Sequence, residues 1–180
     1  MRMGSLRTRA LATVVALAML TGATTPQWRD WAYDFDEDVK PWKEIEGKIP
    51  GYPKPENLLP FEAGAPAEHR YYLDALSVSI GEDQVVRYTL VVKAAGGATN
   101  VTFEGMRCET REQKIYAVGR ADGNWVRARK PLWRRVEYQN VNRHHGVLYK
   151  EFLCSGPLPV ASEREVQQRL KYGAPVRNSE

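Results

Sequence analysis

The side chains best suited to acid–base or metal chemistry in this chain are its three histidines, His69, His144 and His145. Adjacent histidines in a strand or loop point apart, and no carboxylate recurs beside them at a spacing typical of metal ligands. We therefore expect solvated loop histidines, with no metal and no cofactor. Catalysis would require several titratable side chains close together. A pocket that gathered Glu104, Glu151, His144 or His145 within hydrogen-bond reach of one another would therefore favour an enzyme.

Covalent catalysis has little support in the sequence. There is no G-x-S-x-G or S-x-x-K motif, so no catalytic serine is indicated. The two cysteines, Cys108 and Cys154, are too far apart for a C-x-x-C redox centre and too few for a four-ligand zinc site. We expect them to form one structural disulfide, which would stabilise the fold by about 4 kcal/mol.

An acidic stretch resembles the opening of a calcium-binding loop. Asp34, Asp36 and Asp38 alternate as the first ligands of an EF-hand do. The sixth position is Val39 instead of glycine, and the twelfth is Ile45 instead of glutamate, which excludes an EF-hand. A solvated acidic segment is the simpler interpretation, and weak divalent-cation binding is the alternative.

One compact group of basic and aromatic residues stands out, and we call it the basic patch. In a strand, Trp125, Arg127 and Arg129 share one face. Three interpretations remain open: a solvated hairpin, a seat for an acidic segment of the same chain, or a binding site for an external anion. The basic patch consists of Trp125, Arg127, Arg129, Lys130, Trp133, Arg134 and Arg135.

The N-terminus predicts export. Three arginines precede an uncharged run from Ala10 to Leu20, and Thr21-Gly22-Ala23 supplies small residues before a cleavage point near Thr24. The run is about half the length of a membrane-spanning helix, and Ala23 stands where a lipoprotein would need cysteine. We expect residues 1–23 to be a signal peptide and the mature protein to be periplasmic, with neither a transmembrane nor a lipid anchor and no nucleic-acid partner.

The mature chain divides into an acidic and a basic part. Without residues 1–23 the formal net charge falls from +4 to +1, and it is distributed as −5 over residues 24–69 and +6 over the rest. The first part, which we call the arm, is rich in proline and in aromatic residues such as Trp42 and Tyr52. Proline disfavours sheet and long helix, so we expect an extended arm that buries rings against a body formed by residues 70–172, with a tail at 173–180.

The body shows the alternation typical of β-strands. Strands are expected within residues 69–76, 78–80, 85–94, 100–108, 112–120 and 125–129, with a short one within 133–138. Residues 143–153 fit a helix slightly better than a strand. A capping box from Ser162 to Glu165 begins a last helix that ends before Gly173. The predicted fold is α+β and mainly β: a single antiparallel meander sheet of about five to six strands with a C-terminal helix and a long extended arm.

The run Phe103-Glu104-Gly105-Met106-Arg107-Cys108, the run from Arg111 to Gly123, and Trp125 resemble the central signature of the cryptic neisserial protein-like (CNP-like) family. Pro41-Trp42-Lys43-Glu44 and the segment from Leu148 to Cys154 also agree, so the resemblance spans nearly all of the mature chain. It implies a small exported protein of Gram-negative bacteria with paired cysteines. The family has no assigned activity or ligand, so the resemblance implies no catalytic residue.

These observations favour a non-catalytic periplasmic protein with a binding or envelope-associated role. Its partner would be an anionic envelope component or another envelope protein. An enzyme, or an accessory subunit of one, that acts on an envelope polymer is the alternative.

Overall fold

A computed structural model describes residues 41–63, 69–137 and 142–174. The predicted signal peptide, the acidic stretch from Asp34 to Asp38 and most of the predicted tail lie outside the described residues.

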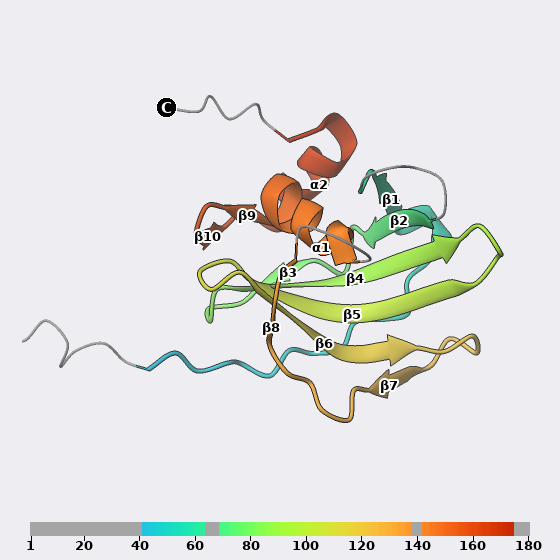
Figure 1. Ribbon diagram of the computed structural model, residues 1–180, viewed down its shortest axis with the longest axis horizontal. Coiled ribbons are helices and arrows are strands. Elements are labelled where there is room, and N and C mark those ends of the chain that lie inside the picture. Colours follow the sequence, from blue (N-terminus) through green and yellow to red (C-terminus); the bar gives the residue numbers. More distant parts are fainter. Residues whose placement is uncertain (1–40, 64–68, 138–141, 175–180) are drawn as a thin grey trace, which may run out of the picture. The chain divides into compact units, whose positions relative to one another are not determined.

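The described chain is built on one antiparallel sheet in which neighbouring strands mostly follow one another along the sequence, as Figure 1 shows. Six strands follow the order β1-β2-β4-β5-β6-β7, and two short strands pair with β4 and β6, which makes eight where about five to six were predicted. The predicted mainly β fold is therefore confirmed. The bounds are β1 (Leu58–Phe61), β2 (His69–Asp74), β3 (Ser79–Ile80), β4 (Val85–Ala94), β5 (Thr99–Arg107), β6 (Glu112–Gly119), β7 (Trp125–Arg127) and β8 (Arg134–Arg135).

The central strand β4 is buried on both faces, because its alternate side chains meet different neighbours. Val86, Tyr88 and Leu90 belong to the cluster that includes residues of the helices. The side chains between them point to the opposite face, where Arg87 contacts Ile45 of the arm. The sheet is thus a middle layer, with helices on one face and the arm on the other.

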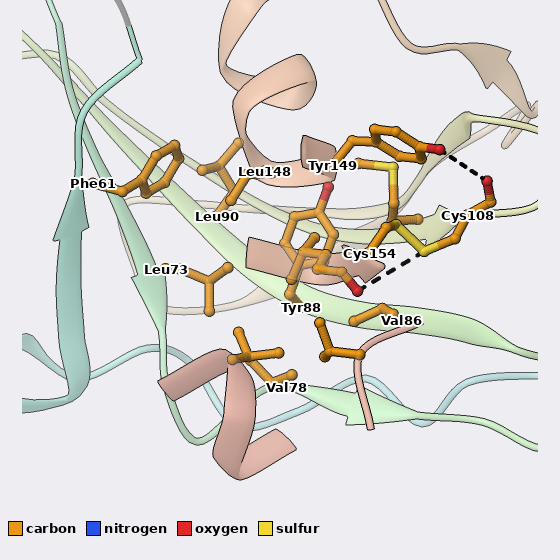
Figure 2. Close-up of a cluster of buried hydrophobic side chains, with 14 of the residues drawn as sticks. Phe61, Leu73, Val78, Val86, Tyr88, Leu90, Cys108, Leu148, Tyr149 and Cys154 are labelled. Atoms are coloured by element: carbon orange, nitrogen blue, oxygen red, sulfur yellow. Dashed lines mark hydrogen bonds between the residues drawn. A yellow bond between two sulfur atoms is a disulfide. The ribbon is translucent and has the colours of Figure 1, made fainter. Parts of the chain in front are cut away.

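Helices α1 (Arg143–Val147) and α2 (Glu163–Tyr172) and the π-helical segment η4 (Leu148–Leu153) group together on one side of the sheet in Figure 1. Their apolar residues, including Leu148 and Val166, complete the main core with the strand residues shown in Figure 2. The helical prediction for residues 143–153 is confirmed. The capping box is also confirmed, because the Ser162 hydroxyl accepts a hydrogen bond from the Glu165 N–H at 3.2 Å.

The predicted disulfide is confirmed. Cys108 follows β5 and Cys154 follows η4, and their Cα atoms lie 5.7 Å apart. Both residues are buried in the main core. The bridge therefore joins the sheet to the helical layer across a separation of 46 residues.

The expectation that no strand forms in the arm is wrong. Strand β1 pairs with β2, and Pro60 lies opposite Tyr72. Proline is tolerated here because β1 is the last strand of the sheet, where one side needs no ladder hydrogen bond. The expected strand within 133–138 shortens to the two residues of β8, and a two-stranded ribbon of β9 (Cys154–Ser155) and β10 (Leu158–Pro159) was not predicted.

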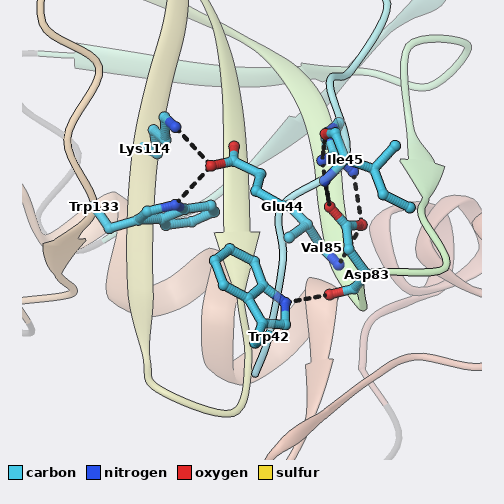
Figure 3. Close-up of polar contacts among 8 residues, drawn as sticks. Trp42, Glu44, Ile45, Asp83, Val85, Lys114 and Trp133 are labelled. Atoms are coloured by element: carbon cyan, nitrogen blue, oxygen red, sulfur yellow. Dashed lines mark hydrogen bonds and ion pairs between the residues drawn. The ribbon is translucent and has the colours of Figure 1, made fainter. Parts of the chain in front are cut away.

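The arm continues over the face of the sheet opposite the helices (Figure 3). The Trp42 indole N–H donates to the Asp83 carbonyl at 2.9 Å, and the Tyr52 hydroxyl donates to the Arg120 carbonyl at 2.8 Å. The arm is therefore held to the sheet at Trp42 and again at Tyr52. In the described part of the chain, no helix is long and apolar enough to cross a membrane.

Candidate functional site

The structure divides the basic patch between the two faces of the sheet. Four of its basic residues line a pocket to which His145 of α1 also contributes: Arg129, Lys130, Arg134 and Arg135. Trp125, Arg127 and Trp133 instead contact the arm. The sequence analysis therefore treated residues of two surfaces as one patch.

The pocket has a volume of about 490 Å³ and lies beside β6 on the helical side of the sheet. Apolar side chains of β6 and of the segment after β8 form part of its wall, and the basic side chains come from the connection between β7 and β8 and from β8 itself. Its lining residues are Gln113, Ile115, Val118, Ala128, Arg129, Lys130, Pro131, Leu132, Arg134, Arg135, Val136, Glu137, Asn142 and His145.

The course of the chain explains why four cations gather there. Strand β7 pairs with one end of β6, where Gly119 lies opposite Trp125. The chain then leaves this edge, passes through Pro131 and rejoins it as β8, which pairs with the other end of β6, where Glu112 lies opposite Arg135. The basic connection therefore runs along the free part of the β6 edge, as Figure 1 shows.

These four cations differ from those under the arm. Within the described chain, none of the four forms an ion pair. On the arm side, by contrast, Lys114 pairs with Glu44 at 2.7 Å and the buried Arg87 pairs with Asp83 at 2.6 Å. The pocket thus has an excess of positive charge, because Glu137 is the one acidic residue in its described lining.

A buried ion pair lies next to the pocket. The Nε2 atom of His145 is 2.8 Å from an Oε2 atom of Glu104, and these residues are only 6% and 2% exposed. The Tyr88 hydroxyl donates to the same carboxylate at 3.0 Å, and the Thr102 hydroxyl donates to its other oxygen at 2.6 Å. Both carboxylate oxygens therefore have partners, as a buried charge requires.

The surroundings shift the pKa values of both members of this pair. Burial raises the pKa of Glu104, but the charge and hydrogen bond of His145 outweigh burial, so the pKa lies below its ordinary value. Burial lowers the pKa of His145, and the Glu104 carboxylate raises it by more, so the pKa lies above its ordinary value. Burial and the same carboxylate raise the pKa of Tyr88 well above its usual range. Both shifts therefore favour the form of the pair in which an imidazolium faces a carboxylate.

The expectation of solvated loop histidines is wrong for two of the three. His144 and His145 lie in α1, and the His144 ring stacks on Tyr71 with 5.0 Å between centroids. His69 is exposed at the start of β2. A signal for the partner of His145 was present in the sequence. Glu104 is two residues from Met106 in a predicted strand, so the two side chains share its inner face, and a buried carboxylate needs a cation.

Of the candidates for convergent chemistry, Glu104 and His145 meet, whereas the side chain of Glu151 is exposed on η4. Glu151 uses its carbonyl oxygen to accept a hydrogen bond from Arg169 at 3.2 Å. Across residues 41–63, 69–137 and 142–174, no group of three histidine, cysteine or acidic side chains is arranged to hold a metal ion.

The remaining residues of the basic patch contact the arm through acids that the sequence analysis did not single out. The Glu44 carboxylate accepts hydrogen bonds from the Trp133 indole at 3.1 Å and from Lys114 (Figure 3). Arg127 reaches Glu46 at 3.2 Å in an exposed pair. The Trp125 ring lies against Tyr52 with 5.6 Å between centroids.

Residues 37–171 match the CNP1-like family, and the chain belongs to that family. The resemblance found in the sequence is thereby confirmed. No curated protein matches the chain, and no solved structure does.

Proposed function

We propose that this protein is an exported, non-catalytic binding protein of the cell envelope, and that its basic pocket takes an anionic envelope component. The observation that carries the proposal is the set of four cations, Arg129, Lys130, Arg134 and Arg135, that surround one pocket without an ion-pair partner in the described chain. Unpaired positive charge around a concave surface attracts anions and raises their local concentration.

Export is supported by the N-terminal sequence and by the disulfide. The charged start, the apolar run and the small residues before Thr24 are typical of a cleaved signal peptide. A buried disulfide between Cys108 and Cys154 is typical of proteins that fold in an oxidising compartment such as the periplasm. An anionic partner of a periplasmic protein would belong to the envelope.

The chemistry of the buried pair supports binding over catalysis. A general base must be unprotonated and within reach of the proton that it removes. The Glu104 carboxylate is 2% exposed and already accepts hydrogen bonds from Tyr88 and Thr102, and it favours the protonated form of His145 beside it. When protonated, His145 therefore offers a hydrogen-bond donor next to the pocket, while its charge is balanced by Glu104.

An enzyme acting on an envelope polymer is the second candidate, because Glu104 and His145 do converge beside a pocket. Catalysis would predict that the bound polymer is shortened or modified on incubation. Binding predicts that it is recovered unchanged.

The test uses fluorescent dextran sulfate, a soluble polyanion, and the mature protein. We expect Arg129→Glu with Lys130→Glu to weaken binding at least tenfold, because the change reverses two cations in the pocket. Both residues lie in a connection and not in a strand, so the fold should persist. Fluorescence anisotropy measures the affinity.

The matched control is Lys54→Glu with Lys171→Glu, which changes the net charge equally at two exposed positions outside the lining of the pocket. The control should lose less than threefold. Equal losses in the two variants would show that only the net charge matters and would contradict a specific site.

A further inference from the structure

We propose that the anionic group taken by the pocket is a phosphate monoester, held by the rim cations and by a hydrogen bond from Nδ1 of His145. This inference rests on the proposed function and specifies its ligand. Three observations carry it: the position of His145, the charge of the lining and the apolar wall.

One ring nitrogen of His145 has a hydrogen-bond partner, and the other can contact a ligand. Its Nε2 atom engages Glu104 at 2.8 Å, and within the described chain its Nδ1 atom has no hydrogen-bond partner. His145 is only 6% exposed, yet it lines the pocket. A ligand oxygen at this position would accept the hydrogen bond that a protonated Nδ1 can donate.

Glu104 determines what Nδ1 offers to a ligand. When the imidazole is protonated, both ring nitrogens are donors; when it is neutral and Nε2 donates to Glu104, Nδ1 is an acceptor. Because the carboxylate raises the pKa of His145, the donor form persists to higher pH than in a histidine without such a partner. The pocket therefore presents an N–H group that suits an anion and would repel it after deprotonation.

The charge of the described lining favours a dianion. Four cations and Glu137 leave three positive charges in excess, without counting His145, whose charge is balanced by Glu104. A phosphate monoester carries about −1.5 to −2 at neutral pH and offers three strong acceptor oxygens. A carboxylate carries one charge and two oxygens, so it would use fewer of these donors.

The wall of the pocket accommodates the group that carries the phosphate. Ile115, Val118 and Val136 supply apolar surface between the basic residues. Leu132 is 62% exposed at the same pocket, which extends this surface outward. The lining thus combines an anion site with apolar contacts, as expected for a site that binds a phosphate ester in preference to free phosphate.

The titratable and charged groups that surround His145 come from every neighbouring element. Glu104 of β5 contacts it directly, Tyr88 of β4 shares that carboxylate, and His144 lies with its ring centroid 4.1 Å from that of His145. The remaining charged groups line the pocket, namely Arg129, Lys130, Arg134, Arg135 and Glu137.

The experiment titrates the mature protein with phenyl phosphate and with benzoate between pH 7 and pH 10. Phenyl phosphate is a dianion over most of this range, since its second pKa is about 6, so a change in affinity reports the protein. We expect phenyl phosphate to bind at least tenfold more tightly than benzoate at pH 7. Its affinity should fall as the pH rises through the raised pKa of His145, because the Nδ1 donor is then lost.

Glu104→Gln provides the decisive variant, because Glu104 is not part of the pocket lining and glutamine preserves its shape. Without the carboxylate the pKa of His145 falls, so the loss of affinity should move to lower pH and the Kd at pH 7.5 should rise about tenfold. An unchanged pH profile in this variant would overturn the inference. If the variant does not fold, nitrogen NMR of the unmodified protein decides: phenyl phosphate should shift the Nδ1 resonance of His145, and no shift would overturn the inference.

Two further ligands distinguish the source of the phosphate. Glycerol 3-phosphate represents a soluble ester, and vesicles of phosphatidylcholine containing phosphatidic acid present the same monoester on a lipid. Binding of either supports the phosphate assignment and identifies the source. If neither binds while dextran sulfate does, the phosphate inference fails and the proposed function survives; if dextran sulfate also fails, both are rejected.

Discussion

Replacing Asp83 with alanine is expected to lower the free energy of unfolding by about 4 kcal/mol, because it leaves a buried arginine without its counter-ion. The side chains of Asp83 and Arg87 are 0% and 5% exposed. The Asp83 carboxylate also accepts hydrogen bonds from the backbone N–H of Ile45 at 2.8 Å and of Val85 at 3.4 Å (Figure 3). Urea denaturation followed by tryptophan fluorescence measures the change.

The matched control removes both charges. Asp83→Leu combined with Arg87→Met should destabilise the protein by less than Asp83→Ala alone, because no buried charge is left unpaired. A second control, Glu109→Ala, breaks a pair whose acid is 68% exposed and should change the free energy of unfolding by less than about 1 kcal/mol. A loss at Asp83 no larger than the loss at Glu109 would contradict a structural role for the buried pair.

Removing the disulfide is expected to have an effect of similar size. Cys108→Ser and Cys154→Ser should each lower the free energy of unfolding by about 4 kcal/mol, since each removes the same cross-link between the sheet and the helical layer. The double variant should lose little more than either single variant. Additive losses in chemical denaturation would show that the two cysteines stabilise the fold separately.

Local sequence signals predicted much of the fold. Strand β4 was predicted with its observed bounds, because its apolar residues end at clear turn signals on both sides. The capping box at Ser162 and Gly173 after α2 likewise depend on residues a few positions apart. The disulfide needed only the count of cysteines and the expectation of export.

Contacts between distant segments were predicted less well. The pairing of β1 with β2 depends on where the edge of the sheet lies, and the residues of the arm carry no information about that position. Glu104 and His145 are 41 residues apart, and their contact depends on how α1 packs on β5. The position of Glu104 among apolar residues of a strand was a signal for a buried carboxylate that was not used, and it does not show which cation would pair with it.

The basic patch shows the same limit within a short stretch. Its residues are close in sequence, but Trp125, Arg127 and Trp133 contact the arm, whereas Arg129, Lys130, Arg134 and Arg135 line the pocket. Strand alternation alone placed Arg127 and Arg129 on one face, whereas the strand ends at Arg127. Contact with the arm therefore involves Trp125, Arg127 and Trp133, and the external ligand is a proposal for the other members of the patch.

The most direct test of the central claim is photocrosslinking in a Gram-negative host that expresses the full chain. The photoreactive residue p-benzoylphenylalanine is placed at Leu132, which is 62% exposed at the pocket, or at Tyr172, which is 84% exposed on α2. Our account predicts that periplasmic protein beginning near Thr24 carries an adduct of an anionic envelope component at Leu132 but not at Tyr172, and that Arg129→Glu with Lys130→Glu abolishes it. Equal adducts at the two positions, or an adduct at Leu132 that persists after the charge reversal, would contradict binding through this pocket.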